Sequence, residues 1–388
     1  MSSEIAQTET ESQAWAATAT LSQWQLIRRR LWRHRLAVAS LFLLIALYIL
    51  ALFAEFFAPY TTRWLELDHA YCPPQQVRFS FSRGFYVYAV KRDVDPITFR
   101  KTYIEDRSDT VPLSFFAKGE KYKLWGLIPG SRHFLGVDHE AYAESTSSAG
   151  GPDAMKPTFY LLGADKYGRD LLSRILYGAR ISLSVGIIGI AITFVLGLTV
   201  GGVSGYLGGA VDNLIQRLIE IMNSLPRLPM WLALAAAMPS DWSPLRTYFA
   251  ITLVLSLLNW ARLARVVRGK ILSLREEDYA MAARLLGAGH GRIIFRHLLP
   301  GFASHIIVAL TLSVPQMILG ETSLSFLGLG LRPPVVSWGV MLQDCMNMTV
   351  VANYPWLLLP VTFIILTVLC FNFLGDGLRD AADPYSSR

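Results

Sequence analysis

The stretch ISLSVGIIGIAITFVLGLTVGGVSGYLGGAV, which runs from Ile181 to Val211, contains no charged side chain. A helix needs roughly 20 apolar residues to cross the hydrocarbon core of a bilayer. The stretch is longer than this, so it predicts a membrane-spanning helix. The composition of the 388-residue chain agrees, because 53% of its residues are hydrophobic and only 17% are charged. These values indicate a membrane protein and argue against an ordinary soluble domain.

Five further stretches are candidate spans. Three of them lack Asp, Glu, Lys and Arg, namely Leu36–Ala54, Phe302–Gly320 and Tyr354–Gly375. Two are weaker, because Leu214–Met238 contains charged residues and Thr247–Ala261 is short. We therefore predict an all-α membrane protein with six spans.

The charged residues in the third stretch have two interpretations. Ionisable groups at membrane depth are candidates for function, which singles out Glu220 and Arg227. Pro226 and Pro229 favour the alternative that the span begins near Leu228. In that case Glu220 lies in a cytoplasmic helix.

The basic residues, which give the chain a net charge of +7, cluster beside the predicted spans. Arginines crowd residues 28–35, and basic side chains fill residues 262–300, whereas the short loops on the other side hold only Arg246 and Arg332. Cytoplasmic loops carry the excess of Lys and Arg, so both termini and residues 262–300 are predicted to be cytoplasmic. This clustering also argues against a nucleic-acid-binding face.

Residues 1–35 are predicted to form a cytoplasmic tail, disordered over 1–20, and residues 36–58 the first span. Apolar side chains recur at helical spacing beside the arginines, which favours a helix lying in the membrane interface. They are Leu21, Trp24, Ile27 and Leu31. The apolar run that follows exceeds a signal-peptide core of about 7–15 residues, so we expect it to remain as an anchor.

Residues 59–160 are predicted to form an external insertion between the first two spans, and residues 161–388 a core with five spans. A connection of this length is usually structured or functional. Val77–Phe81 and Phe85–Val90 are typical of strands, whereas Ala143–Pro157 is rich in Ser, Gly and Pro and is typical of a flexible connector.

The insertion offers weak candidates for a metal site or a disulfide. Its histidines are His69, His133 and His139. A set of His133, Asp138 and His139 matches no strong ligand pattern, so we interpret the histidines as surface residues and predict no metal site. Cys72 and Cys345 would both be external, but no pattern places them together, so a disulfide is not expected.

Four glycines, Gly197, Gly201, Gly205 and Gly209, recur at every fourth residue in the second predicted span. This spacing puts them on one helical face, where another helix can approach closely. A tight interface in a bundle that must move and a static packing groove both fit the pattern.

Residues 163–170, GADKYGRD, superficially resemble a phosphate-binding loop. Arg169 and Asp170 stand where such a loop needs Lys and then Ser or Thr, and the predicted topology puts the segment outside. The segment is therefore not expected to bind ATP. No zincin motif or nucleophile elbow occurs, so we predict no catalytic, cofactor-binding or metal-binding residues.

Residues 262–300, after the fourth span, are the most informative. Ser273-Leu-Arg-Glu276 fits a capping box, which predicts a helix that begins there and stops at Gly287. A second short helix, Arg292–Leu298, should end at Pro300. Two such helices with small and apolar side chains form a knob suited to a groove in a partner protein. The predicted contact residues are Tyr279, Met281, Ala282, Ala283, Leu286, Gly287 and Pro300. The alternative is a solvated basic loop.

The string Met281-Ala-Ala-x-x-x-Gly287, followed by His297-Leu-Leu-Pro300, resembles the EAA coupling motif of ATP-binding-cassette (ABC) importer permeases. Met281 replaces the usual Glu and His297 the usual Ile. From about residue 160 onward the chain is similar to the dipeptide/oligopeptide/nickel branch of these permeases. The segments that carry this likeness are Leu162–Arg174, Tyr177–Arg180, Leu324–Gly330, Pro333-Pro334, Ser337–Gly339, Gly375–Asp380 and Asp383-Pro384.

The resemblance implies a type I importer permease of the bacterial inner membrane, which forms half of a translocation path for peptides or similar solutes. The expected partners are a second permease, two ATP-binding subunits that hold ATP and Mg²⁺, and a periplasmic solute-binding protein. The chain itself is expected to bind no cofactor and to be no enzyme, and ATP-driven closure would push on the knob. The alternatives are a stand-alone secondary carrier, which should show an internal repeat, and a membrane enzyme, which should show a convergent catalytic set. Neither pattern is seen.

Overall fold

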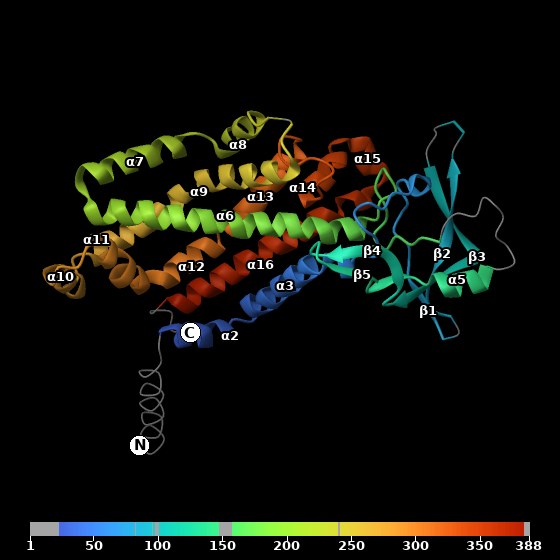
Figure 1. Cartoon of the computed structure of the whole chain (residues 1–388), viewed down its shortest axis with the longest axis horizontal. Coiled ribbons are helices and arrows are strands. Elements are labelled where there is room, and N and C mark those ends of the chain that lie inside the picture. The colour runs from blue at the N-terminus through green and yellow to red at the C-terminus, as the bar shows by residue number, and fades with distance from the viewer. Residues whose placement is uncertain are drawn as a thin grey trace, which may run out of the picture.

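The computed structural model describes residues 23–81, 83–94, 96–97, 101–146, 157–239 and 241–383. The tail predicted to be disordered, residues 1–20, and most of the predicted connector, residues 147–156, lie outside these ranges. The described chain is elongated, with a bundle of long helices at one end and a β-rich cap, formed by residues 59–160, at the other (Figure 1).

Helices form the bundle. In chain order they are α2 (Gln23–Arg33), α3 (Arg35–Leu52), α4 (Ala54–Phe57), α6 (Leu171–Leu207), α7 (Gly209–Ser224), α8 (Arg227–Ala236), α9 (Pro244–Leu274), α10 (Asp278–Leu285), α11 (His290–Arg292), α12 (Ala303–Thr311), α13 (Val314–Phe326), α14 (Trp338–Met341), α15 (Met348–Asn353) and α16 (Leu359–Ala382). Between α11 and α12 lie a π-helical turn, Ile293–Leu298, and a 3-10 turn, Leu299–Phe302. Further 3-10 turns lie at Leu342–Met346 and Pro355–Leu358.

Five helical segments of the described chain are long and apolar enough to cross a membrane. They are Arg35–Leu52, Leu171–Leu207, Pro244–Leu274, His290–Phe326 and Pro355–Ala382. These segments correspond to the first, second, fourth, fifth and sixth predicted spans. The prediction of a membrane protein with several apolar spanning helices is therefore confirmed.

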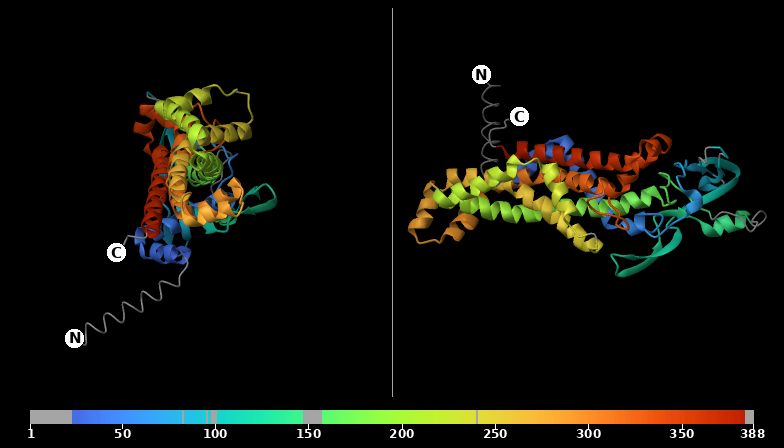
Figure 2. Two further views of the ribbon diagram at one scale, coloured as in Figure 1. Left: turned by 90° about the vertical axis from the view of Figure 1, so that its left-hand side faces the viewer. Right: turned by 90° about the horizontal axis from the view of Figure 1, so that it is seen from above.

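The predicted third span, Leu214–Met238, is divided between α7 and α8, so the count of six is not confirmed. The backbone is extended at Leu225 and Pro226 between the two helices. Proline lacks a backbone N–H and disfavours the helical conformation of the preceding residue. Each helix alone is too short to cross a bilayer. Figures 1 and 2 show α7 and α8 in succession along the outside of the bundle.

Glu220 and Arg227 do not form a pair. Glu220 accepts from exposed Arg217 at 3.2 Å on the surface of α7. Arg227 lies at the start of α8, where its Nη1 is 3.4 Å from the side-chain oxygen of Gln316. The break between α7 and α8 therefore separates the two groups that the sequence places two turns apart.

Helix α6 occupies the centre of the bundle, as the end-on view in Figure 2 shows. It begins at Leu171, well before the predicted start at Ile181, because Asp170 caps its N-terminus. The Asp170 carboxylate accepts from the backbone amide of Ser173 at 2.7 Å and from its hydroxyl at 2.6 Å. A buried apolar cluster joins α6 to α3, α13 and α16.

The cap contains a four-stranded antiparallel sheet in the order β1–β2–β3–β6 and a separate antiparallel hairpin, β4–β5. Its elements are β1 (Arg78–Ser80), β2 (Gly84–Val94), β3 (Lys101–Phe115), β4 (Lys118–Leu124), β5 (Ile128–Arg132), β6 (Leu135–Val137) and α5 (His139–Thr146). The two predicted strands correspond to β1 and the first half of β2, so both are confirmed. Cys72 and Cys345 are free thiols.

Two cap histidines are buried, so the prediction of surface histidines is wrong for His69 and His133. The ring nitrogens of His133 lie 2.5 Å from the carbonyl oxygen of Ala58 and 3.0 Å from that of Glu120. His133 therefore ties the end of the first span to the cap. His139 is exposed, and the described residues contain no group of three or more His, Cys, Asp or Glu that could hold a metal.

Candidate functional site

Residues 274–300 form a compact helical knob at the end of the bundle away from the cap (Figure 1). Helix α10 begins at Asp278, so the predicted capping box at Ser273 is wrong. Ser273 belongs to the last turn of α9, and the N-cap of α10 is Glu277, which makes no side-chain capping bond. Helix α9 extends this far because Ile271, in its last turns, is completely buried in the cluster that underlies the knob.

Helix α10 ends before Gly287, which has a φ of +79°. The Ala288 amide donates to the Ala283 carbonyl at 3.1 Å, and the Gly287 amide to the Arg284 carbonyl at 3.0 Å. These two bonds form a Schellman motif, in which a left-handed residue satisfies carbonyl groups at a helix end. A Cβ atom added at Gly287 would meet nothing within 4 Å, so only the backbone conformation favours glycine there.

The two alanines in the middle of α10 differ in burial. Ala283 is buried in a cluster with Ile293 and Leu298, beneath the helix. Ala282 is exposed. The prediction that both alanines lie on the contact surface is therefore wrong for Ala283, because its side chain packs α10 onto the second helix of the knob.

The outward face of α10 is apolar. Leu285 and Leu286 are each 88% exposed, and Tyr279 and Met281 are about half-exposed. These four residues and Ala282 are called the α10 ridge below. Leu285 is not among the contact residues predicted from the sequence. Its position beside Leu286 at the end of a short helix is a signal that could have indicated it. Exposed apolar side chains grouped in this way are typical of a protein-binding surface.

Pro300 does not end the second helix of the knob, contrary to the prediction. It lies in the first turn of the 3-10 turn Leu299–Phe302, and the chain continues directly into α12. Proline is tolerated in the first turn of a helix because the N–H there has no helical acceptor. Pro300 is exposed, at the boundary between the knob and the fifth predicted span.

An ion pair holds the end of α9 near the knob against the start of α7. The guanidinium of Arg268 donates two hydrogen bonds to the Asp212 carboxylate, both at 2.5 Å, and Ser204 donates another at 2.5 Å. The bonds from Arg268 hold the pKa of Asp212 below its usual value. Arg275, just after α9, donates to the carbonyl oxygen of Gly205 on α6 at 3.2 Å. The knob is thus tied to α6, α7 and α9 together.

The contact between α6 and α9 is lined by glycines on α6, namely Gly197, Gly201 and Gly205. A Cβ atom at Gly201 would lie 2.5 Å from the carbonyl oxygen of Ala264, so a larger residue would push the helices apart. Gly209 does not share this face. Helix α6 ends at Leu207, and Gly209 opens α7 with a φ of +55° and nothing within 4 Å of an added Cβ.

A buried carboxylate that the sequence analysis does not predict lies on α13. Glu321 accepts hydrogen bonds from Ser325 at 2.8 Å, Ser337 at 2.7 Å and Ser182 at 3.2 Å. Ser182 belongs to α6 and Ser337 caps α14, so Glu321 joins the central helix to the loop after α13. The sequence does contain a signal for this site, because the acidic residue Glu321 directly follows the uncharged stretch that ends at Gly320.

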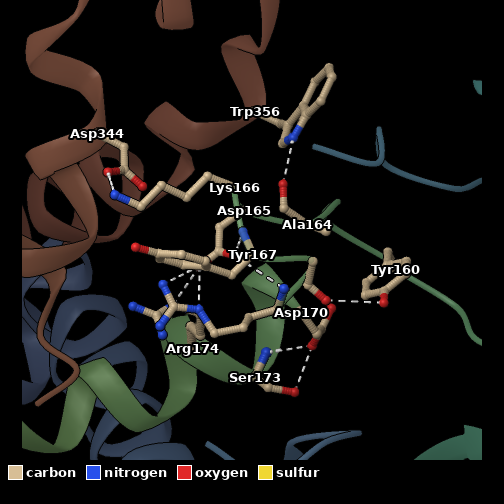
Figure 3. A network of polar contacts seen from close by, with 12 residues as sticks. Tyr160, Ala164, Asp165, Lys166, Tyr167, Asp170, Ser173, Arg174, Asp344 and Trp356 are labelled. Carbon is tan, nitrogen blue, oxygen red and sulfur yellow. Dashed lines mark hydrogen bonds and ion pairs between the residues drawn. The ribbon is translucent and has the colours of Figure 1, made fainter. Parts of the chain in front are cut away.

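At the cap end, the loop before α6 is held by a polar network (Figure 3). The Asp165 carboxylate accepts from the amides of Tyr167 at 2.8 Å and Arg169 at 3.1 Å, and from Nε of Arg169 at 2.7 Å. Nε of Arg174, on α6, lies 3.4 Å from the same carboxylate. Gly168 completes the turn with a φ of +70°. The polar side chains that mimic a phosphate-binding loop are thus directed at one another.

The same loop is joined to the chain before α16. Lys166 pairs with Asp344 at 2.9 Å, and the indole N–H of Trp356 donates to the carbonyl oxygen of Ala164 at 3.2 Å (Figure 3). Asp170, next to this network, is fully buried, and burial raises its pKa to about 6. These contacts connect segments that are far apart in the sequence.

Comparisons with known proteins indicate the family of the chain. The family model described as "Binding-protein-dependent transport system inner membrane component" matches residues 178–387. A second model, "N-terminal TM domain of oligopeptide transport permease C", matches residues 22–74. A chain of the MetNI methionine ABC transporter in an inward-facing conformation aligns with a TM-score of 0.41 and 18% identity, over 53% of this chain and 95% of that chain.

Curated relatives are permease proteins. The dipeptide transport system permease protein DppC of Bacillus subtilis is 43% identical over 223 residues, which cover 57% of this chain and 68% of that protein. The oligopeptide transport system permease protein OppC of Escherichia coli is 42% identical and is covered over 72% of its length, with 58% of this chain aligned. The glutathione transport system permease protein GsiD of Pectobacterium atrosepticum is 37% identical over 66% of this chain and 81% of that protein. Such permeases are membrane components of transport systems and are not enzymes. The chain therefore belongs to the family of binding-protein-dependent transport system inner membrane components.

Proposed function

We propose that this chain forms half of the translocation path of a type I ABC importer for peptides or similar small solutes. The relatives named for dipeptide, oligopeptide and glutathione transport support this solute class. In the proposed assembly a second homologous permease, two ATP-binding subunits and a periplasmic solute-binding protein join the chain at the bacterial inner membrane. ATP and Mg²⁺ bind to the ATP-binding subunits, not to this chain.

The exposed apolar surface of the α10 ridge is the observation that supports the knob as the coupling site. Full burial of a leucine side chain stabilises an interface by about 1.5–3 kcal/mol, so covering Leu285 and Leu286 strongly favours association. A groove in an ATP-binding subunit is the proposed partner. A force on the ridge reaches α9 through the packing of Ala283, and the ion pair at Asp212 and the glycine contact at Gly201 carry it to α7 and α6.

Placing negative charges on the apolar ridge tests this role. The variant Leu285→Asp/Leu286→Asp should lose co-purification of the ATP-binding subunits and solute-stimulated ATP hydrolysis. Its thermal stability should stay near that of the wild type, because both side chains are exposed. The matched control is Met348→Asp, which changes an exposed apolar residue on α15 at the opposite end of the bundle. This variant should keep both the co-purification of the ATP-binding subunits and the solute-stimulated ATP hydrolysis. Normal association of the double variant contradicts the proposal.

The alternative of a basic tether makes a different prediction. Neutralising Arg284, Arg292 and Arg296 together by glutamine should then abolish association, whereas the two leucine substitutions should have little effect. The same co-purification and hydrolysis measurements distinguish the two accounts.

We further propose that residues 59–160 form a periplasmic insertion that contacts the solute-binding protein or the second permease, with both termini and the knob cytoplasmic. Residues 75–177 lie between the two segments that the family models match, which supports an insertion. Single cysteines at Ser131 in the cap and at Gly289 in the knob, in a cysteine-free background, should react with an impermeant thiol reagent from opposite sides. Reaction of both from one side contradicts this orientation.

A further inference from the structure

The tip of the β4–β5 hairpin holds large apolar side chains that are exposed on the described chain. Leu127 is 80% exposed, Ile128 is 54% exposed and Trp125 is 46% exposed. Trp125 has a φ of +52°, a left-handed conformation that costs a non-glycine residue roughly 1–2 kcal/mol. A strained turn that holds large apolar groups outward suggests that something outside the chain binds them.

The tip lies beside the end of the first span. The indole N–H of Trp125 donates to the carbonyl oxygen of Leu52, the last residue of α3, at 2.8 Å. Its ring is 5.5 Å, between centroids, from the ring of Phe53. Figure 1 shows β4 and β5 next to the end of α3. The hairpin is thus held at a fixed depth relative to a membrane-spanning helix.

This depth matches the edge of the hydrocarbon core. Arg180 of α6 donates to the carbonyl oxygens of Ala51 at 3.1 Å and Leu52 at 2.9 Å, and it pairs with Glu55. The uncharged stretch of α6 begins at the next residue, Ile181. A charged pair at the start of an apolar run marks the membrane boundary, and tryptophan prefers this interface.

Exposed apolar side chains lie on α3 as well as on the tip. Ile45, Ile49 and Leu52 are about half-exposed on α3, and the tip, which Trp125 joins to Leu52, exposes Leu127 and Ile128. Two exposed lysines on β4, Lys121 and Lys123, lie just behind the tip. Lysine side chains near an interface reach the phosphate groups of lipids while their alkyl chains stay with apolar groups.

We propose that the β4–β5 tip, residues 124–128, inserts into the lipid interface of the leaflet on the cap side and anchors the cap to the membrane. Lys121 and Lys123 of β4 bind lipid phosphates there. A protein surface is the other possible occupant. The exposed apolar side chains of α3 and the fixed depth at Leu52 favour lipid.

Photo-crosslinking tests the anchor without changing the cysteines. The photoreactive residue p-benzoylphenylalanine is placed at Leu127 in the otherwise unchanged full chain, and in a second variant at Phe81. Phe81 is a fully exposed apolar residue in the turn between β1 and β2, and Figure 1 shows these strands farther from the bundle than β4 and β5. Both proteins are reconstituted into nanodiscs of phosphatidylethanolamine and phosphatidylglycerol, illuminated and analysed by mass spectrometry.

We expect several-fold more lipid adducts at position 127 than at position 81. Equal, low yields at both positions would mean that the tip lies in water, and a cross-link to a second copy of this chain would mean that a protein covers it; either result overturns the proposal. In the position-127 protein, replacing Lys121 and Lys123 by glutamine should lower the ratio of phosphatidylglycerol to phosphatidylethanolamine adducts several-fold. An unchanged ratio rules out their role in binding phosphate. Because no other subunit of the proposed assembly is present, the result does not depend on the proposed solute and partners.

Discussion

The loop at residues 163–170 and the knob at residues 274–300 lie at opposite ends of the bundle, and each contains a glycine in the left-handed region, Gly168 and Gly287 (Figure 1). The loop directs its charged side chains at one another, at α6 and, through Lys166, at Asp344 before α16 (Figure 3). The knob buries Ala283 and leaves Leu285 exposed. The side chains of the loop are therefore directed at the chain itself, whereas part of the knob is directed outward.

The difference has a physical cause. Polar groups buried in the loop need partners, and the nearest partners are in the chain itself, so the loop is stable without any other protein. Leu285 and Leu286 on the α10 ridge are left largely uncovered by the described part of the chain, so association would remove their apolar surface from water. The loop should thus be sensitive to changes that disturb the fold, and the ridge to changes that disturb association.

The largest expected effect contrasts the two left-handed glycines. A Cβ atom at Gly168 would lie 1.7 Å from the carbonyl oxygen of Glu66, so Gly168→Ala forces the backbone to move. We expect a loss of more than about 4 kcal/mol of stability, or no folded protein. Gly287→Ala has free space and should cost only about 1–2 kcal/mol. Thermal unfolding of both variants in detergent measures the two losses of stability. Equal losses would contradict the expected difference between Gly168 and Gly287.

A second test compares a buried ion pair with an exposed one. Asp165→Asn leaves Arg174, which is buried, without its anionic partner, and should cost about 3–4 kcal/mol. The control is Arg217→Gln, which breaks the exposed pair with Glu220 and should cost at most about 0.5 kcal/mol. Unfolding by denaturant in micelles measures both. A small loss for Asp165→Asn would mean that the network in Figure 3 does not stabilise the loop.

A third test uses the neighbouring alanines of α10. Ala283→Leu adds volume to a packed cluster and should cost about 1–3 kcal/mol. Ala282→Leu adds the same atoms to an exposed position and should change stability by less than about 0.5 kcal/mol. Differential scanning fluorimetry of the two variants is sufficient. If Ala282→Leu were the more destabilising of the two, the orientation of α10 would be wrong.

The last test concerns a pH dependence at the cap end. Because burial raises the pKa of Asp170 to about 6, the folded state holds a proton between about pH 4 and 6 that the unfolded state has lost. Stability from this group therefore falls as pH rises through that window, by at most about 1.4 kcal/mol per pH unit, and is constant above it. Asp170→Asn keeps an acceptor for Ser173 and should lose this slope.

The pH test needs the difference between wild type and variant. Burial lowers the pKa of His69 to about 4, so its contribution to stability is lost as pH falls from about 6.5 to 4, opposite in sign to that of Asp170. His69 is present in both proteins, and its effect cancels when their melting temperatures are subtracted at each pH. A difference that does not vary between pH 4 and 6 would show that Asp170 titrates normally.

The sequence by itself determines the membrane character of the chain, most of its spans and the stop of α10 at Gly287. These features depend on local quantities, because an uncharged run of sufficient length must leave water and a glycine tolerates a left-handed conformation without strain. The two strands at residues 77–81 and 85–90 are predictable for the same reason, since alternation and turn residues are local signals.

Only the tertiary structure decides which side of each helix is buried and which is exposed. Helix α10 carries apolar residues around most of its circumference, so its pattern cannot say that Ala283 is buried and Ala282 is exposed. Gly209 continues the spacing of the α6 glycines, but the turn at Gly208 ends the helix to which that spacing applies. Lys166 and Glu321 each have a partner from a distant part of the chain, Asp344 and Ser182, because polar groups are satisfied by whatever the fold brings near, which no local pattern specifies.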